Sequence, residues 1–384
     1  MKLVYLSNYF NHHQKYLADE LYKRLGDDYI FVETKELPEE KIKLGYHQYA
    51  EPYVFRYNKE TKDYLDRLIY DADAVLFGEA PVCLIKKRVR ARKLVVRDDE
   101  RRYKAAIKYL KWPIYTYNSL FFNKGCLLAA SAFAPRDYIL SGMKASKCYK
   151  WGYFPEVKHY DDINAIIEKK SKKGLKHPDV SILWVARLIG LKHPESLVYV
   201  ANKLRQDGYD FEIKIIGIGP LSQTIKESIE DNRLSNYVKM LGAMPPERVR
   251  EYMEKADIFL FTSDQNEGWG ATLNESMNSA CAVVAGHMIG SVPYLLKDSE
   301  NGLIFESKNW ESLYIKVKWL IDHPEERREM GRNAYETMLK IWSPENAAKN
   351  LISFLEAKLQ GEETPIPFGP CSKADILNRN WIKF

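Results

Sequence analysis

Two carboxylates have the spacing needed to hold the two ends of one elongated ligand. Glu267 and Glu275 stand eight positions apart, the first in a loop with two glycines and the second near the expected start of a helix. The apolar run 256–261 before them predicts a buried strand. A strand, a glycine turn and a helix N-terminus leave backbone N–H groups free to stabilise an anion. Because carboxylates accept hydrogen bonds from hydroxyls, the stretch favours a sugar attached to a diphosphate.

Two cations follow another predicted strand, at 180–186. Arg187 and Lys192 lie in the loop after that strand, and ligands of open parallel sheets collect at the carboxyl ends of the strands. Arginine offers a planar fork to two phosphate oxygens, whereas lysine supplies a compact point charge. The alternative is a pair of solvated surface cations; the position after a strand favours phosphate contact.

A glycine turn marks a third strand end. Gly217 and Gly219 close the strand 211–216 and precede a helix expected near 220–230. Such glycines permit a tight turn and close approach of a phosphate, although a purely structural turn is the alternative. The turn after the first strand, at 3–6, has no GxGxxG pattern, which argues against a dinucleotide there. Nucleotide binding is therefore expected in the second half.

Length and patterning indicate two α/β domains. A chain of 384 residues exceeds one ordinary core, and alternating strand and helix patterns predict parallel sheets covered on both faces. We expect two Rossmann-like, doubly wound domains facing a cleft. The expected divisions are a first domain, a linker, a second domain, and a C-terminal helix and tail that return to the first domain: 1–155, 156–179, 180–342 and 343–384.

Composition favours a cytoplasmic protein. The cysteines number five, an odd count, and form no CxxC pair, so a disulfide or zinc framework is not expected. No run reaches the ~20 apolar residues that span a bilayer. The chain is therefore expected in a reducing compartment.

A basic stretch raises the question of an anionic partner. Residues 81–150 hold 17 basic and 4 acidic side chains, and 81–124 mixes lysines with aromatic residues such as Trp112 and Phe121. That mixture is typical of a membrane-surface segment; a solvated basic face or a buried amphipathic helix are the alternatives. No nucleic-acid-binding motif accompanies the charge, so nucleic acid is not an expected partner.

Polar side chains in the first half are candidates for the acceptor side of a reaction. His12 and His13 come after the first strand, where one imidazole could contact a phosphate or an acceptor; structural histidines are the alternative. Asp98, Asp99 and Glu100 follow the strand 94–96. We expect these three to form a solvated acidic turn, with a position facing the cleft as the alternative.

Four segments together carry a family resemblance. ARLIGLKHPE, IIGIGP, VKMLGAMPPERV and ADIFLFTSDQNEGWGATLNESM occur in this order within 180–306 and resemble the family 4 retaining glycosyltransferases of the GT-B fold. More loosely, SNYFNHHQ, DDERRYK and YKWGYFPE resemble acceptor domains of bacterial polysaccharide glycosyltransferases. The chain departs from the family in lacking a Gly-rich loop after the first strand, and in having Ala280-Cys281-Ala282 where Gly-x-Pro is usual.

The resemblance implies roles for the matching residues. Arg187 and Lys192 would neutralise the donor diphosphate, and Glu267 would contact hydroxyls of the donor sugar, making these three the implied catalytic residues. Glu275 would hold the ribose. The remaining implied donor-binding positions are Gly217, Gly219, Ala243, Met244, Gly270, Ala271, Thr272 and Leu273. Trp269 would either pack under the loop or help to shape the sugar pocket.

The implied activity is transfer of a sugar from a nucleoside-diphosphate sugar, with retention, to a glycan or lipid-linked glycan acceptor in bacterial surface polysaccharide synthesis. No cofactor and no metal are expected, because Arg187 and Lys192 serve the diphosphate; the D-x-D at Asp71 and Asp73 is expected to be a helix-end feature. The enzyme would work in the cytoplasm, peripherally at the inner membrane face. The alternatives are a nucleotide-sugar epimerase of the same fold and a non-catalytic nucleotide-sugar-binding scaffold.

Overall fold

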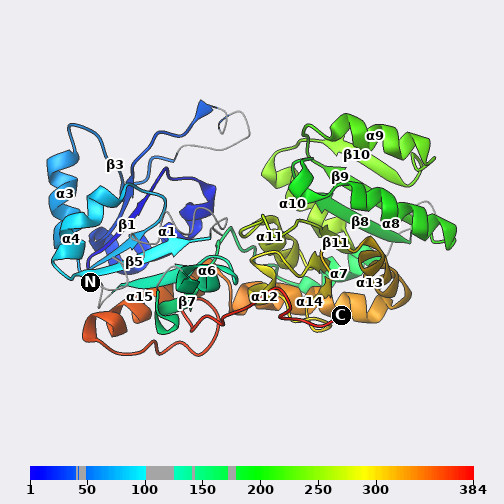
Figure 1. Ribbon diagram of the computed structural model, residues 1–384. Helices are drawn as coiled ribbons and strands as arrows, with labels where there is room; N and C mark the ends of the chain where they lie inside the picture. Colours follow the sequence, from blue (N-terminus) through cyan, green and yellow to red (C-terminus); the bar gives the residue numbers. More distant parts are fainter. Residues whose placement is uncertain (40–41, 43–48, 101–124, 141–142, 172–178) are drawn as a thin grey trace. The chain divides into compact units, whose positions relative to one another are not determined.

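Two compact units make up the chain. The computed structural model describes residues 1–39, 42, 49–100, 125–140, 143–171 and 179–384. The first unit comprises Met1–Glu156 with Ile341–Trp381, and the second comprises Val157–Lys340 with Ile382–Phe384. In each unit helices cover both faces of a central sheet (Figure 1), as the alternating strand and helix patterns predict.

The described part of the first unit contains a parallel sheet of seven strands. Their order is β3-β2-β1-β4-β5-β6-β7. Its strands are β1 Leu3–Ser7, β2 Tyr29–Glu33, β3 Val54–Arg56, β4 Ala74–Phe77, β5 Leu94–Asp99, β6 Cys126–Ala129 and β7 Cys148–Lys150. Its helices are α1 His12–Leu25, α3 Lys62–Asp71, α4 Lys86–Arg90, α6 Ala134–Leu140 and α15 Pro344–Gln360. All residues of β1, β2 and β4 are buried, as expected where helices cover a parallel sheet on both faces.

The second unit is built in the same way, with six strands in its described part in the order β10-β9-β8-β11-β12-β13. Its strands are β8 Val180–Val185, β9 Phe211–Ile216, β10 Val238–Gly242, β11 Ile258–Phe261, β12 Ala282–Gly286 and β13 Leu303–Phe305. Its helices are α7 Ile163–Ser171, α8 Glu195–Gln206, α9 Ser222–Asp231, α10 Pro246–Lys255, α11 Thr272–Asn278, α12 Val292–Leu295, α13 Trp310–Asp322 and α14 Pro324–Lys340. Neighbouring strands pair in parallel, for example Val180 with Phe211.

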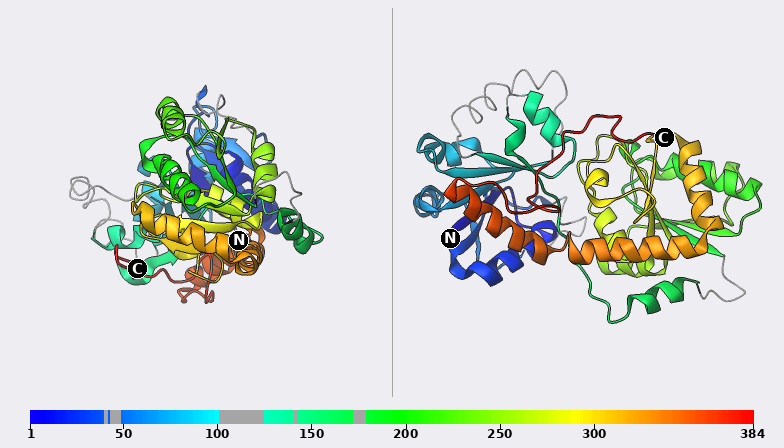
Figure 2. Two further views of the ribbon diagram at one scale, coloured as in Figure 1. Left: turned by 90° about the vertical axis from the view of Figure 1, so that its right-hand side faces the viewer. Right: turned by 90° about the horizontal axis from the view of Figure 1, so that it is seen from below.

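The core of the second unit lies between its sheet and the helices α8, α9 and α13. Trp184 and Ile213 of the sheet pack there with Leu197 and Leu313 of the helices, all at most 2% exposed. Figure 2 shows the helices and the sheet of this unit from two further directions. Burial of such apolar residues, at roughly 25 cal/mol per Å², fixes the strand ends that carry the candidate site.

The segment 156–179, predicted to be a linker, contains helix α7, which belongs to the second unit. Lys170 in α7 is buried, and its ammonium donates to the carbonyl oxygens of Ser279 (2.7 Å) and Ala280 (2.8 Å). Ala280 has φ 53°, a left-handed conformation that favours glycine. A buried lysine therefore holds the turn where the family usually has Gly-x-Pro.

Residues Ile341–Trp381 belong to the first unit. Helix α15 packs on α1, and the irregular tail after it forms an antiparallel bridge between Tyr149 and Lys373. The D-x-D at Asp71 and Asp73 spans the end of α3 and the turn into β4, which confirms the helix-end interpretation. The buried Arg88 donates there to the carbonyl oxygens of Ile69, Tyr70, Ala72 and Asp73.

The glycine turn after β9 is required by the backbone itself. A Cβ on Gly217, which has φ +135°, would lie 1.9 Å from the Ala186 carbonyl oxygen, and one on Gly219 would lie 2.4 Å from that of Leu188. The two chain segments hydrogen-bond, because the N–H of Leu188 donates to the Ile218 carbonyl (3.1 Å). These contacts support the structural alternative for both glycines.

We predict that Gly217→Ala lowers the free energy of unfolding by about 3 kcal/mol or more, because the substitution adds both backbone strain and a clash with the main chain. The matched control is Gly208→Ala, since Gly208 has φ +80° but open space around its Cβ position; its cost should be about 1–2 kcal/mol. Chemical denaturation measures both. Equal losses in the two variants would show that the approach to Ala186 is unimportant.

Candidate functional site

The predicted donor residues gather at one edge of the second sheet. The chain proceeds from β8 to β9 and β10 on one side, and β11 to β13 follow on the other side of β8. The loops after β8 and β11 therefore leave the sheet at its topological switch point, where open α/β sheets bind ligands. Arg187 and Lys192 lie in the first of these loops and Glu267 in the second.

Lys192 and Glu267 form an ion pair. Lys192 ends the short 3₁₀ helix Gly190–Lys192, and its ammonium meets a carboxylate oxygen of Glu267. The two side chains are only 15% and 14% exposed, so water screens their charges weakly. The structure thus brings together a cation suited to phosphate and a carboxylate suited to sugar hydroxyls.

The backbone beneath this pair is fixed by buried hydrogen bonds. The indole Nε1 of Trp184 donates to Thr262 Oγ1 (2.9 Å), and that hydroxyl donates to the carbonyl oxygen of Lys192 (2.6 Å). The N–H of Asp264 donates to the Leu191 carbonyl (3.0 Å). The loop after β8 is therefore tied to the loop after β11 at two points.

His193 adds a charged link between the same two loops. It has a left-handed φ of 52°; its Nδ1 lies 2.7 Å from Glu195 and its Nε2 lies 3.4 Å from Asp264. The hydrogen bond with Glu195 raises the pKa of His193 above its usual value, against burial and with help from Asp264. Burial would raise the pKa of Asp264, but hydrogen bonds from Asn266 and Lys308 lower it below its usual value.

Gly270 and Trp269 shape the end of the loop after β11. Gly270 has φ +82°, and a Cβ there would lie 2.3 Å from the ring of Phe261. Trp269 is fully buried, and its Nε1 donates to Asn274 Oδ1 (2.8 Å). Of the two predicted roles for Trp269, the structure shows the packing role under the loop.

The other predicted donor residues differ in exposure and position. Arg187 is exposed and Glu275 is half-buried on α11, while Leu273 is buried and its N–H donates to the Gly270 carbonyl (3.0 Å). The N–H of Leu273 is thus already engaged, and a phosphate would have to compete with the Gly270 carbonyl for it. The remaining positions lie at strand-end turns or at the start of α11: Gly217, Gly219, Ala243, Met244, Ala271 and Thr272. Their roles toward a donor stay predictions.

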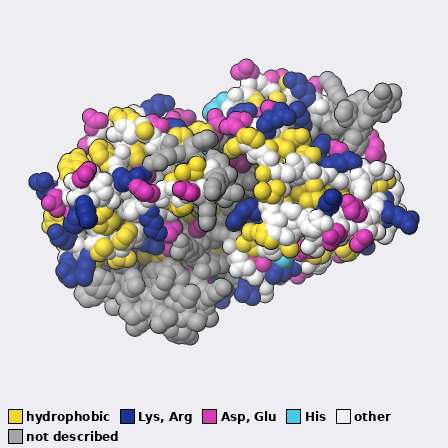
Figure 3. Space-filling model, turned by 90° about the horizontal axis from the view of Figure 1, so that it is seen from above, with side chains coloured by type: hydrophobic (Ala, Val, Ile, Leu, Met, Phe, Trp, Pro, Cys, Tyr) yellow, Lys and Arg dark blue, Asp and Glu magenta, His cyan; other side chains and the backbone are white. Residues whose placement is uncertain are grey.

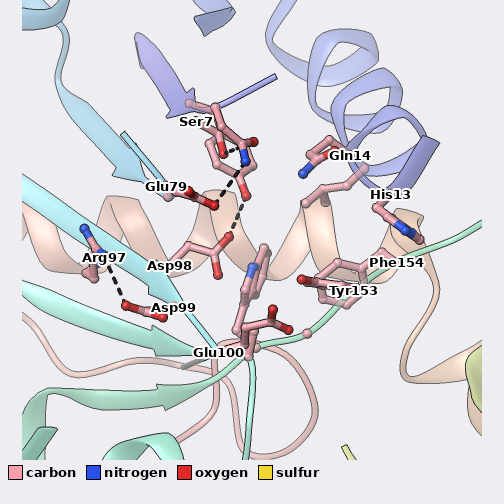
Figure 4. Close-up of a pocket in the computed structure, with 17 residues that line it drawn as sticks. Ser7, His13, Gln14, Glu79, Arg97, Asp98, Asp99, Glu100, Tyr153 and Phe154 are labelled. Atoms are coloured by element: carbon pink, nitrogen blue, oxygen red, sulfur yellow. Dashed lines mark hydrogen bonds and ion pairs between the residues drawn. The ribbon is translucent and has the colours of Figure 1, made fainter. Parts of the chain in front are cut away.

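A pocket of about 150 Å³ opens in the first unit. It is lined from the ends of β1, β4 and β5 and from residues 151–154 (Figure 4). Strands β1 and β4 are neighbours in the sheet, with β2 and β3 continuing on one side and β5 to β7 on the other, so the pocket also lies at a topological switch point.

Two aspartates at this pocket correct the prediction of a solvated acidic turn. Asp98 and Asp99 are part of β5; Asp98 accepts a hydrogen bond from the Tyr5 hydroxyl (2.5 Å) and Asp99 one from the Tyr138 hydroxyl (2.7 Å). Burial raises the pKa of Asp98 to about 7, and the Tyr5 hydrogen bond opposes this. The turn prediction was wrong because the strand runs three residues beyond its apolar part, carrying both carboxylates inward.

Two of the three candidate acceptor residues line this pocket. His13 and Glu100 do so, and the imidazole of His13 stacks on Tyr153 with ring centroids 5.5 Å apart. His12 begins α1 and packs against His13, at 4.0 Å between ring centroids. Contact of any of the three with an acceptor stays a prediction.

Sequence reasoning missed the residues that fix the two sites. Thr262 and Asp264 follow β11 directly, and their position after a buried strand was the available signal. Tyr5 lies within an apolar strand, and nothing in its neighbourhood marks it as a partner of Asp98, 93 positions away. Such distant pairings depend on strand order, which one sequence does not display.

The basic stretch 81–124 is described only in part, since 101–124 lies outside the described residues. Within 81–100, Arg88 is buried against carbonyl oxygens and Arg97 pairs with Asp99. On the face drawn in Figure 3, basic and acidic side chains are interspersed. Among the described residues, no helix is long and apolar enough to cross a membrane.

Comparisons with known proteins agree with this architecture. Residues 165–337 match the family model described as "Glycosyl transferases group 1". The solved structure of HepE from Anabaena in complex with UDP has a TM-score of 0.68 and 15% sequence identity, and covers 93% of this chain and 100% of that one. The predicted fold, two Rossmann-like α/β domains of the GT-B class, is confirmed; their arrangement about a cleft stays a prediction.

Curated relatives match about half of the chain. The amylovoran biosynthesis glycosyltransferase AmsK of Erwinia amylovora is 34% identical over 193 residues, which cover 48% of this chain and 45% of that protein. A Campylobacter jejuni N-acetylgalactosaminyltransferase acting on a diphospho-undecaprenol acceptor is 27% identical over 189 residues, covering 49% and 50%. The chain thus spans about half the length of these relatives, and the matched part is similar to glycosyltransferases.

The link through His193 predicts a pH-dependent stability. Because the pKa of His193 is raised in the folded protein above its usual 6.5, its contribution is complete below that value and is lost as the pH rises through the folded pKa. His193→Gln should therefore destabilise the protein by about 1.5 kcal/mol near pH 6 and by less near pH about 9. Denaturation at both pH values tests this, with the exposed His159→Gln as control; a loss independent of pH would contradict it.

The raised pKa of Asp98 also predicts a loss of stability with rising pH, over a lower pH range. Since its folded pKa is raised from 3.8 to about 7, the folded state binds the extra proton and loses stability as the pH rises between those values. Asp98→Asn should remove this loss, raising stability near pH 8 by up to roughly 4 kcal/mol and changing it little near pH about 4. Melting temperatures across this range measure the effect, and the exposed Asp63→Asn is the control. A variant less stable than the parent at pH 8 would rule out the raised pKa.

Proposed function

We propose that the protein is a retaining glycosyltransferase. It moves a sugar from a nucleoside-diphosphate sugar to a glycan or lipid-linked glycan acceptor, in bacterial surface polysaccharide synthesis. The observation that carries the proposal is the pairing of Lys192 with Glu267 at the switch point of the second sheet. The structural neighbour HepE was solved with UDP and with UDP-glucose, which supports a nucleotide-sugar donor for this fold.

The chemistry follows from what the paired groups can do. As the bond between sugar and diphosphate breaks, negative charge develops on the leaving oxygen, and a fixed ammonium such as Lys192 stabilises it. Arg187, exposed in the same loop, adds a second cation. A prearranged charge of this kind is typically worth about 2.7–4 kcal/mol in the transition state. Glu267 accepts hydrogen bonds from the donor sugar, so the mechanism needs no enzyme nucleophile.

Anomeric retention and independence of metal complete the proposal. With cations on the diphosphate, the leaving phosphate can take the proton from an acceptor hydroxyl that attacks on the same face, and the configuration is retained. Glu275, half-buried on α11, holds the ribose. The names of the relatives AmsK and the Campylobacter jejuni transferase refer to amylovoran biosynthesis and to a diphospho-undecaprenol substrate, which supports an acceptor of this kind. We further propose that the protein works at the inner membrane face.

The direct test is turnover of a panel of nucleotide sugars. Lys192→Met and Glu267→Gln should each lower turnover about 100-fold, because each removes a contact made to the reacting groups. Lys226→Met, an exposed lysine on α9, is the matched control and should leave turnover unchanged. Unchanged rates in both site variants would refute the assignment.

The products separate the competing functions. A transferase forms a glycoside whose anomeric configuration, read by NMR, matches that of the donor. An epimerase would instead interconvert nucleotide sugars without an acceptor. A scaffold would raise its melting temperature with a nucleotide sugar and turn none over. We expect a metal chelator to leave the transferase activity unchanged. Loss of activity with the chelator would contradict the proposed independence of metal.

A further inference from the structure

The pocket of the first unit has the size of a small polar ligand. Its volume is about 150 Å³, and since one water needs roughly 10–15 Å³ by this measure, the pocket has room for about ten. A single sugar ring is of comparable size. In Figure 4, Glu79 and Asp98 stand on one side and Gln14 and Tyr153 on the other, so a ring between them would meet polar groups from both.

Polar side chains line both sides of this space. Asp98 is held in place by the Tyr5 hydroxyl at 2.5 Å and by a hydrogen bond with Trp151. On the opposite side, the amide oxygen of Gln14 is buried and has no hydrogen-bond partner among the described residues. The side-chain amide of Gln14 also has two N–H donors, and Gln14 lines the pocket, so the amide can hydrogen-bond a ligand hydroxyl.

The charge of the lining disfavours anions. Carboxylates of Glu79, Asp98 and Glu100 line the pocket. The guanidinium of Arg97 also lines it, but is engaged by Asp99 at 3.1 Å and lies over the Phe77 ring, 4.6 Å from the centroid. A carboxylate or phosphate in the pocket would therefore meet like charges in a weakly solvated space.

Aromatic rings supply the apolar part of the lining. Trp151 and Phe154 are each 1% exposed and Tyr153 is half-buried beside them. A concave site with aromatic walls and a few converging polar groups is the usual form of a small-molecule pocket. Rings of this kind suit the C–H face of a sugar, whereas its hydroxyls meet Asp98 and Gln14.

We propose that this pocket binds one uncharged sugar ring and rejects a ring that carries a carboxylate. That the ring belongs to the acceptor rests on the proposed transferase function. Asp98 and Gln14 are its hydroxyl-binding residues, and the carboxylates of the lining set the selection against anions.

Binding of simple glycosides tests the pocket without any reaction. Saturation-transfer NMR near pH 8 compares methyl glucoside, galactoside, mannoside and N-acetylglucosaminide with methyl glucuronide, which differs from the glucoside only by its carboxylate. At least one neutral glycoside should bind, about tenfold more tightly than the glucuronide. Binding of the glucuronide as tight as the best neutral ring, or saturation of none of the neutral four, would overturn the proposal.

Three variants locate the site. Gln14→Leu should weaken the neutral glycoside at least threefold, and Asp98→Asn should reduce its preference over the glucuronide, because the amide keeps hydrogen bonding but removes the charge. Asp63→Asn, an exposed aspartate on α3, is the control and should change neither. Melting curves confirm folding of each variant. Full binding and selectivity in both pocket variants would refute the site.

Turnover separates this inference from the transferase function. Neutral glycosides that bind while no nucleotide sugar is consumed would leave the pocket assignment standing and refute the transferase. Turnover that prefers uronic-acid acceptors and is unchanged by Asp98→Asn would support the transferase function and refute the pocket assignment. Each claim can therefore fail without the other.

Discussion

The ion pair between Lys192 and Glu267 is the constraint on which the second unit's chemistry depends. It joins the loops after β8 and β11, two neighbouring strands whose loops diverge at the switch point. A lysine and a glutamate left apart in solvent would attract each other weakly. Here both are largely buried, and Thr262 and Trp184 fix the lysine's backbone, so the pair has the fixed arrangement that the proposed nucleotide-sugar donor requires.

Three glycines outside the ion pair help to place the residues that form it. Gly217 and Gly219 let the turn after β9 hydrogen-bond to residues 186–188, which begin the loop of Lys192. Gly270 makes room for Phe261, whose ring lies 6.0 Å from the lysine ammonium. The glycine turn that suggests phosphate binding in the sequence is therefore first a condition for placing the loop that carries Arg187 and Lys192.

The sequence predicted the elements well because their signals are local. Apolar runs such as 180–186 and 211–216 located β8 and β9, and the spacing of Glu267 and Glu275 located the loop and α11. It did not predict the inward turn of Asp98, because that depends on Tyr5 from another strand. Nor did it predict that Lys170 would fix the turn at Ala280 from a helix inside the expected linker. Both contacts depend on which elements become neighbours.

Each unit thus carries a polar site at its own switch point, with opposite electrostatic character. The site in the second unit joins cations to a carboxylate, whereas the pocket in the first is lined mainly by carboxylates and aromatic rings. The division suits a reaction in which an anionic donor and an uncharged acceptor ring must be told apart.

A double-mutant cycle shows whether Lys192 and Glu267 act as one unit on the donor. Turnover of the best nucleotide sugar is measured for Lys192→Met, Glu267→Gln and the double variant. We predict a coupling of about 2.7 kcal/mol, close to the whole loss in one single variant, so that the double variant is scarcely slower than the slower single variant. Losses that add in full would contradict it.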